Sequence, residues 1–273
     1  MVVACRLRFV NLVTQLWARY RNSMVDLKSE EFRALWEPRD NPATGVWRVR
    51  RRLAAAMRLV IERLTTSDAP EEELAVVAAR LEDYADRLAD HPQRDRYDGF
   101  AEAAVADPAA AKKSMGGAHF DFSPLIGQSN PLAPPIVITS DEQGVRGEAT
   151  FGSAYEGPPG CVHGGCIAAA FDEVLGYTQT FTGQPGMTGT LETLYRSPTP
   201  LHTPLVFRSH VESIEGRKVI CRGTLHEGDR LCAEAKAIFI SLREGKMAGL
   251  VDKRAMRTRA GTAAQSEPSD KNS

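Results

Sequence analysis

Apolar residues recur at helical spacing in two segments of the N-terminal half. Residues 47–64 and 70–90 each carry such a stripe, and His91-Pro92 ends the second one. The stripe positions are Leu53, Met57, Val60, Ile61 and Leu64 in the first segment and Leu74, Val77, Ala78, Leu81, Tyr84, Ala85 and Leu88 in the second. This pattern predicts an antiparallel helical hairpin, which we assign to an extension over residues 47–110.

Beyond Pro134-Pro135 the spacing of apolar residues changes from 3.6 to 2, which is typical of half-buried strands. Turn sequences divide this part into short segments, and the last three form a meander. The predicted strands are 136–139, 145–152, 187–195, 205–214, 219–226 and 231–242. Residues 134–243 are therefore predicted to form one compact domain that contains an antiparallel sheet.

A single helix, residues 162–181, is predicted between the second and third strands. It is apolar on every side and has no Lys or Arg, yet it carries the adjacent carboxylates Asp172 and Glu173. A helix that is apolar all round must be covered on most sides, and an antiparallel sheet that curls around it does this. The fold class is predicted to be α+β, with a sheet wrapped around a central helix and an N-terminal helical extension.

The remaining segments show neither the helical spacing nor the strand spacing of apolar residues. Residues 1–46 are predicted to be an N-terminal segment that is partly flexible, residues 111–133 a connection, and residues 244–273 a disordered tail. The segment before Met24 does not resemble a signal peptide, because polar residues interrupt it and no small-residue cleavage site follows. Translation that starts at Met24 is an alternative, which the intact mass of the native protein would test.

Composition narrows the function classes. The net charge of −1 gives no basic footprint for nucleic acid, and no run of eighteen apolar residues predicts a membrane span. The five cysteines are odd in number and form no C-x-x-C pair, which is typical of reduced thiols in a cytoplasmic protein. No metal is predicted, since the spacing of Cys161, His163 and Cys166 matches no usual zinc pattern.

The candidate chemistry lies at and within the central helix. A Gly-Pro-Pro-Gly turn, residues 157–160, leads into His163-Gly164-Gly165, so free backbone N–H groups are expected at the helix N-terminus. Asp172 follows His163 by nine residues, about two and a half helical turns. We expect burial to raise the pKa of Asp172 toward neutrality, which suits a general base.

These features together resemble the hotdog-fold acyl-CoA thioesterases, in particular the phenylacetate-pathway (PaaI-type) branch. The resemblance is carried by the His-Gly-Gly helix with its Asp at +9, the strand that begins Met187-Thr188, and the Tyr195-Arg196-Ser197-Pro198 turn. It covers residues 120–243 and implies nothing about residues 1–110. Some family members carry an Asn six residues before the His, but Gly157 stands at that position here.

The resemblance implies an acyl-CoA substrate, no cofactor beyond the CoA of that substrate, and a homodimer or a dimer of dimers. The dimer joins two sheets edge to edge, with active sites at the subunit boundary. Asp172 is the implied general base or nucleophile, and the Gly164 and Gly165 amides bind the thioester oxygen. His163 orients the carbonyl region, and Thr188, contributed from the other subunit, places the water.

Four further residues are predicted to contact the substrate. Phe171 lines the acyl tunnel, Arg196 meets the CoA phosphates, and Glu173 and Thr190 complete the contacts. Simpler roles remain open: His163 can cap the helix, Asp172 can be structural while Glu173 is the active group, and Arg196 can be an exposed turn charge.

Two other functions remain open. One is a hotdog hydratase or dehydratase acting on acyl thioesters. The other is a catalytically silent acyl-CoA-binding or assembly module, with the helical hairpin as its docking arm. The acyl group, and whether the thiol is CoA or an acyl carrier protein, do not follow from these residues.

Overall fold

A computed structural model describes residues 45–92 and 120–241, apart from 135, 142–143 and 185. Its helices are α3 (Gly45–Leu64), α4 (Glu71–Ala89), the short 3₁₀ helix η1 (Ser153–Tyr155) and α7 (Gly164–Thr180). Its strands are β1 (Val137–Asp141), β2 (Gly144–Ala149), β3 (Gly186–Tyr195), β4 (Leu205–Glu215), β5 (Lys218–Glu227) and β6 (Arg230–Ser241). Three predictions concern residues outside this described part, except for residues 45 and 46: a partly flexible N-terminal segment, a start at Met24 and a disordered C-terminal tail.

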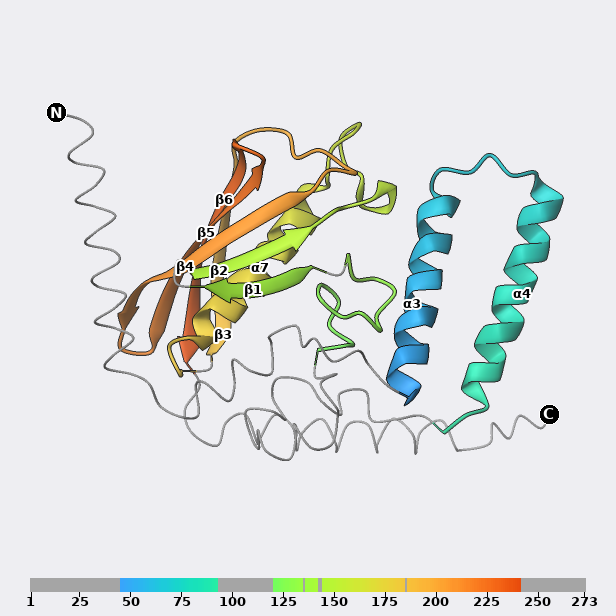
Figure 1. Cartoon of the computed structure of the whole chain (residues 1–273), viewed down its shortest axis with the longest axis horizontal. Coiled ribbons are helices and arrows are strands. Elements are labelled where there is room, and N and C mark those ends of the chain that lie inside the picture. Colours follow the sequence, from blue (N-terminus) through green and yellow to red (C-terminus); the bar gives the residue numbers. More distant parts are fainter. Residues whose placement is uncertain (1–44, 93–119, 135, 142–143, 185, 242–273) are drawn as a thin grey trace, which may run out of the picture.

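The six strands form one antiparallel sheet in the order β1-β2-β4-β5-β6-β3. The helix α7 lies across this sheet and packs against β2 through β6 (Figure 1). The predicted α+β hotdog arrangement, a sheet around a central helix, is confirmed. The second predicted strand was too long, because the chain turns into η1 after Ala149.

The helix α3 docks onto the sheet domain through three polar contacts. Arg51 donates two hydrogen bonds to the carboxylate of Asp121, at 2.8 and 2.7 Å. About two turns further along α3, Arg58 donates to the carbonyl of Asn130 (2.8 Å). About one turn beyond Arg58, Glu62 accepts from the backbone N–H of Ser153 (2.9 Å). The contacts fix α3 against both η1 and the segment 120–134.

The segment 120–134, most of which falls in the predicted connection 111–133, is irregular and packs against the folded domain. Asp121 and Ser123 are buried, and Ser129 donates a 2.6 Å hydrogen bond to Asp121. The residues of this segment are mostly turn formers with no regular spacing of apolar positions, so the sequence did not predict their burial. Their partners lie about 70 residues earlier in α3, and sequence spacing carries no information about such a contact.

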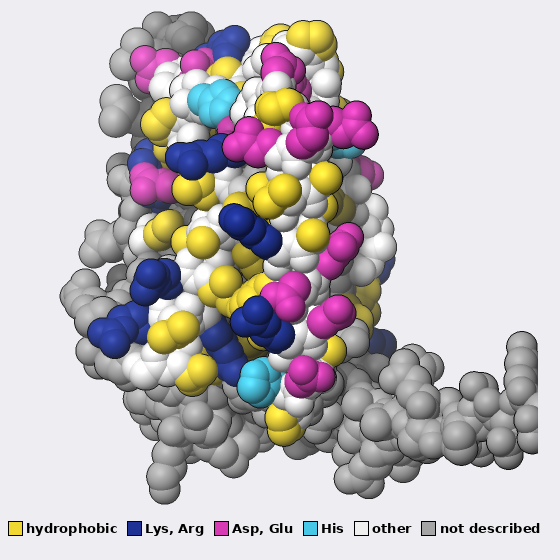
Figure 2. Space-filling model, turned by 90° about the vertical axis from the view of Figure 1, so that its right-hand side faces the viewer, with side chains coloured by type: hydrophobic (Ala, Val, Ile, Leu, Met, Phe, Trp, Pro, Cys, Tyr) yellow, Lys and Arg dark blue, Asp and Glu magenta, His cyan; other side chains and the backbone are white. Residues whose placement is uncertain are grey.

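The helices α3 and α4 are confirmed, but none of the apolar positions in their two predicted stripes is buried in the described part of the chain. No residue of α4 is buried, and its stripe is substantially exposed. Figure 2 faces this side of the molecule and shows hydrophobic side chains lying between basic and acidic ones.

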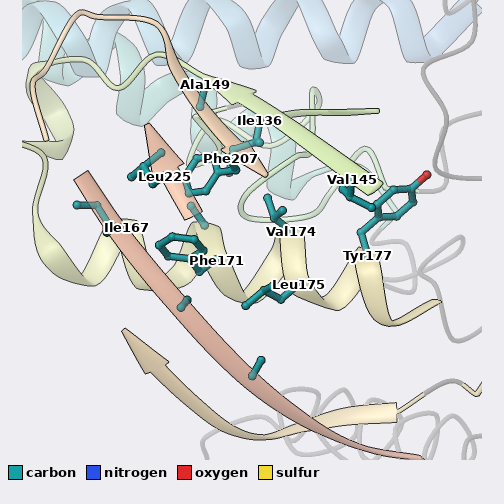
Figure 3. Close-up of a cluster of buried hydrophobic side chains, with 14 of the residues drawn as sticks. Ile136, Val145, Ala149, Ile167, Phe171, Val174, Leu175, Tyr177, Phe207 and Leu225 are labelled. Atoms are coloured by element: carbon teal, nitrogen blue, oxygen red, sulfur yellow. The ribbon is translucent and has the colours of Figure 1, made fainter. Parts of the chain in front are cut away.

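The main core lies between α7 and the sheet. Phe171, Val174 and Leu175 of α7 are fully buried, and Val174 points toward the side on which Phe207 and Leu225 lie (Figure 3). The Phe171 and Phe207 rings meet edge to face at 5.2 Å. Burying side chains of this size stabilises a fold by about 1.5–3 kcal/mol each, so this interface anchors α7.

Strand β3 forms one edge of the sheet and contains a bulge at Gly189. The register places Thr188 opposite Phe239 and Thr190 opposite Ile238, so one extra residue stands between the two threonines. A side chain at position 189 would meet Ile240 at 3.0 Å, which explains the glycine. Because a bulge changes which face a side chain points to, Thr188 faces α7 and Thr190 faces away from it.

Candidate active site

A tight loop leads into α7. Gly160 has a φ of 73°, and its N–H donates to the Glu156 carboxylate at 2.7 Å. The Val162 N–H donates to the Thr199 carbonyl at 2.8 Å, which ties the loop to the segment after β3. A side chain at position 157 would lie 2.8 Å from the His163 Cα, so Gly157 is required for this path. An Asn cannot stand there unless the backbone shifts.

His163 caps the N-terminus of α7. Its Nδ1 accepts a 3.0 Å hydrogen bond from the Gly165 N–H, which leaves Nε2–H as a donor in the neutral imidazole. Among the described residues none accepts from the Gly164 N–H. Of the two amides predicted to bind the thioester oxygen, Gly164 is therefore the one that remains available.

Tyr195, at the end of β3, fixes the first turn of α7. Its hydroxyl donates a 2.8 Å hydrogen bond to the Gly164 carbonyl, and a Cβ at position 164 would lie 3.2 Å from that hydroxyl. From the sequence, Tyr195 was recognisable only as part of a turn motif. Its placement depends on how β3 lies along α7, and residue spacing alone does not give that arrangement.

Asp172 and Thr188 form a direct pair. The Thr188 hydroxyl donates a 2.8 Å hydrogen bond to the Asp172 carboxylate. Asp172 is half-buried and Thr188 is exposed, so solvent reaches the pair. Thr188 was expected to reach Asp172 from a second subunit, but the observed hydrogen bond joins the two residues within a single chain. The Gly189 bulge explains the difference, because it turns Thr188 toward the helix.

Glu173 differs from its neighbour. Burial raises the pKa of Glu173 to about 7, opposed by a 3.3 Å hydrogen bond from Ser123 and reinforced by the nearby charge of Asp172. Of the two adjacent carboxylates, Glu173 is thus the one that burial affects strongly. Ser123 was missed by sequence analysis, since it lies in the segment predicted to be irregular.

Three of the predicted substrate contacts lie elsewhere. Phe171 is fully buried against Phe207 in the core, so it exposes no surface to a ligand. Thr190 faces the opposite side of the sheet from α7. Arg196 pairs with Glu234 at 2.5 Å on that outer side. Phe171, although it lies on the central helix, packs in the core. The bulge at Gly189 turns the Thr190 side chain to the face away from α7.

Arg196 borders a cavity of about 400 Å³ on the outer face of the sheet. The charged residues of its lining are mainly basic and include Arg146, Arg208, Arg222 and Lys236. Asp172 and Thr188 are not among the lining residues. The cavity and the candidate chemistry therefore lie on opposite faces of the sheet.

The arrangement offers a solvent-accessible carboxylate with a hydroxyl partner and a separate helix N-terminus with a free N–H. A carboxylate of this kind can take a proton from water or attack an electrophilic carbon, and a free helix N–H can bind an oxyanion. The described residues contain no cluster of His, Cys, Asp or Glu fit for a metal ion. None of the described helices is long and apolar enough to cross a membrane.

Comparison with known proteins agrees with this picture. Residues 159–234 match the Thioesterase superfamily. Acyl-coenzyme A thioesterase THEM4 of Xenopus laevis is 42% identical over 93 residues, which are 33% of this chain and 42% of that protein. Human acyl-coenzyme A thioesterase THEM5 is 31% identical over 94 residues, 34% of this chain and 38% of that protein. The chain thus matches less than half the length of these relatives.

A solved structure of a thioesterase superfamily protein is similar over a longer range. It is 31% identical, with a TM-score of 0.59, and the match covers 75% of this chain and 93% of the other. This coverage exceeds the sheet domain, so the similarity includes residues outside it. On the strength of this match, the chain belongs to the thioesterase superfamily.

Proposed function

We propose that this protein hydrolyses acyl-CoA thioesters and that Asp172 is the catalytic carboxylate. The observation that carries the proposal is the Asp172–Thr188 pair, a solvent-accessible carboxylate held by a hydroxyl at 2.8 Å. Curated relatives of the same superfamily are acyl-coenzyme A thioesterases, which supports the substrate class.

The reaction follows from the chemistry of the pair. Asp172, acting as a general base, takes a proton from a water molecule that the Thr188 hydroxyl helps to place. The water oxygen bonds to the thioester carbon, the C–S bond breaks, and the thiolate leaves and takes up a proton. In the nucleophilic alternative, the Asp172 oxygen attacks first, and water then hydrolyses the resulting anhydride.

The oxyanion donor must come from a second copy of the chain. Gly164 precedes Asp172 by eight residues, about 12 Å along the helix axis, so one carbonyl group cannot reach both within one subunit. The exposed edge strand β3 offers a surface on which two sheets can join. We therefore place the Gly164 N–H of one subunit opposite Asp172 of its partner, with His163 Nε2–H beside it.

Thiol release from a panel of short, medium, long and aryl acyl-CoAs tests the activity. Wild type is expected to release CoA from at least one class. Asp172→Ala should lower kcat by about 10²–10⁴-fold, the range for a lost general base. Thr188→Val removes one hydrogen bond and should cost about 10–100-fold. If wild type binds acyl-CoA without releasing CoA, the protein is a binding module and the proposal is wrong.

Mixing two inactive variants tests the shared site. Gly164→Pro removes the N–H at a helix position that tolerates proline, and Gly164→Ala is its control because it adds a Cβ but keeps the N–H. Each of Gly164→Pro and Asp172→Asn should be inactive alone. Random mixed dimers contain one intact site, so exchange of the two should restore about a quarter of the wild-type rate. No recovery after confirmed exchange would contradict the shared site.

A further inference from the structure

Glu62, near the C-terminal end of α3, holds its carboxylate against the short helix η1. One carboxylate oxygen accepts a 2.9 Å hydrogen bond from the Ser153 N–H, and the other accepts from the Ala154 N–H at 3.4 Å. The bond from Ser153 is the main cause that lowers the pKa of Glu62 below its ordinary value. The residue before η1 is Gly152, which has no side chain to accept these bonds. Glu62 supplies the missing acceptor from a distant part of the chain.

Gly152 leaves the space that the Glu62 carboxylate occupies. A Cβ at position 152 would collide with that carboxylate. The backbone of Gly152 is extended, with a φ of −87°, so its conformation does not itself require glycine. The close approach of Glu62 is therefore what the glycine permits.

The turn before β4 adds a second contact to η1. His202 Nε2 lies 3.0 Å from the Ser153 hydroxyl and 4.0 Å from the Glu62 carboxylate. The His202 N–H donates to the Phe151 carbonyl at 2.8 Å. His202 has a φ of 56°, an unfavourable value outside glycine that surrounding contacts must hold in place. Glu62, η1 and this turn thus form one connected cluster.

The helix η1 is joined directly to the start of α7. The carbonyl of Tyr155, the last residue of η1, accepts a 2.8 Å hydrogen bond from the His163 N–H. The Tyr155 ring meets Phe151 edge to face at 5.4 Å, and its hydroxyl donates to the Leu132 carbonyl at 2.9 Å. His163 in turn caps α7 through the Gly165 N–H. Hydrogen bonds and three residues of η1 therefore connect Glu62 to His163.

We propose that Glu62 is a positioning residue: by holding η1, it sets where His163 and the Gly164 N–H lie. This inference rests on the proposed function, in which the Gly164 N–H binds the oxyanion and His163 Nε2–H lies beside it. Such donors lower the barrier only when they stand where the negative charge develops. The helix α3 is thus part of the framework of the active site.

Kinetic constants separate positioning from substrate binding. Glu62→Ala should lower kcat for the best acyl-CoA about tenfold and leave KM within about twofold, because oxyanion contacts strengthen in the transition state. Glu62→Gln keeps an oxygen that can accept from Ser153 and should recover part of the loss. Gly152→Ala displaces the carboxylate while Glu62 itself is unchanged, and it should reproduce the loss. A change in KM alone would place Glu62 in substrate binding and contradict the proposal.

Arg51→Ala is the matched control on the same docked face of α3. Arg51 lies eleven residues before Glu62, about 16 Å along the helix axis, and its hydrogen bonds go to Asp121 and not to η1. The variant weakens the docking of α3 but should leave kcat within about twofold of wild type. Equal losses of kcat in Arg51→Ala and Glu62→Ala would show that only the general attachment of α3 matters, and the proposal would be wrong.

The ¹⁵N signals of the His163 imidazole report its placement without any need for catalysis. In the structure Nδ1 accepts from the Gly165 N–H and Nε2 carries the proton, so the two nitrogens of the neutral ring differ. The full chain, labelled at its histidines, is measured at pH 8, and His163→Gln assigns the signals. Glu62→Ala and Gly152→Ala should move these signals, whereas Arg51→Ala should leave them in place.

This measurement distinguishes failure of the inference from failure of the proposed function. Unchanged His163 signals in Glu62→Ala would overturn the inference even in an active thioesterase. Altered signals in a protein that releases no CoA would uphold the placement of His163 by Glu62 and reject only the proposed function.

Discussion

The helices α7 and α4 have similar lengths and both carry apolar residues at helical spacing, but their surroundings differ. Nine of the seventeen residues of α7 are buried, whereas none of the nineteen residues of α4 is. Strands of the same chain cover α7, whereas every residue of α4 is exposed in the described part of the chain. Apolar spacing thus predicts that a helix will be covered, but it does not identify the surface that covers it.

The largest expected effect lies in the α7 core. Phe171→Ala leaves a cavity between α7 and Phe207 and should lower the free energy of unfolding by about 3–5 kcal/mol. Chemical denaturation of the full chain, followed by far-ultraviolet circular dichroism, measures the change in the free energy of unfolding. A loss below about 1 kcal/mol would mean that Phe171 lines an accessible tunnel, as the sequence first suggested.

Glu173 tests how α7 tolerates a charge. Its pKa in the folded state, about 7, lies above the ordinary value of 4.5, so the native state binds the proton more tightly. Its contribution to stability is fully present below about pH 4.5 and is lost as the pH rises through 7. The loss amounts to about 3 kcal/mol.

Glu173→Gln should remove this pH dependence. The variant is expected to match wild type near pH 5 and to exceed its free energy of unfolding by about 2–3 kcal/mol at pH 8. Urea titrations at the two pH values give the comparison. Parallel pH profiles for wild type and variant would show that Glu173 is ionised normally in the folded protein.

Arg51 tests the attachment of α3 to the sheet domain. Arg51→Ala leaves the buried carboxylate of Asp121 with Ser129 as its remaining partner and should cost about 2 kcal/mol. The exposed neighbour Arg52 has no such contact, so Arg52→Ala serves as the control and should change stability by less than about 0.5 kcal/mol. Equal effects of the two variants would contradict the docking contact.

Leu81 should show the smallest effect on the sheet domain. Leu81→Ala should change the free energy of unfolding by less than about 0.5 kcal/mol, since Leu81 is already exposed. A loss comparable to that of Phe171→Ala would show that α4 is covered by its own chain, and the contrast between the two helices would fail.

Most of the fold could be predicted from the sequence, because its signals are local. The change from a 3.6 to a 2-residue period located the main strands and helices of the described part of the chain, and the apolar helix with its carboxylates required a surrounding sheet. The exceptions rest on contacts between distant residues. The burial of Asp121 depends on Arg51, and the environment of Glu173 depends on Ser123.

The candidate site was predictable in its residue types but not in its geometry. The motif identified His163 and Asp172, but the bulge at Gly189 decides that Thr188 meets Asp172 while Thr190 faces away. A bulge depends on the partner strand, which the sequence of one strand does not reveal. The capping bond from Gly165 to His163 likewise depends on backbone geometry at the helix start.

The assignment of chemistry to Asp172 is tested most directly by comparing the two adjacent carboxylates. CoA release is measured for wild type, Asp172→Asn and Glu173→Gln with the best acyl-CoA, at pH 6 and pH 8. The account predicts that Asp172→Asn loses about 10²–10⁴-fold in kcat while Glu173→Gln stays within about threefold of wild type. The reverse pattern would make Glu173 the catalytic group and contradict the account.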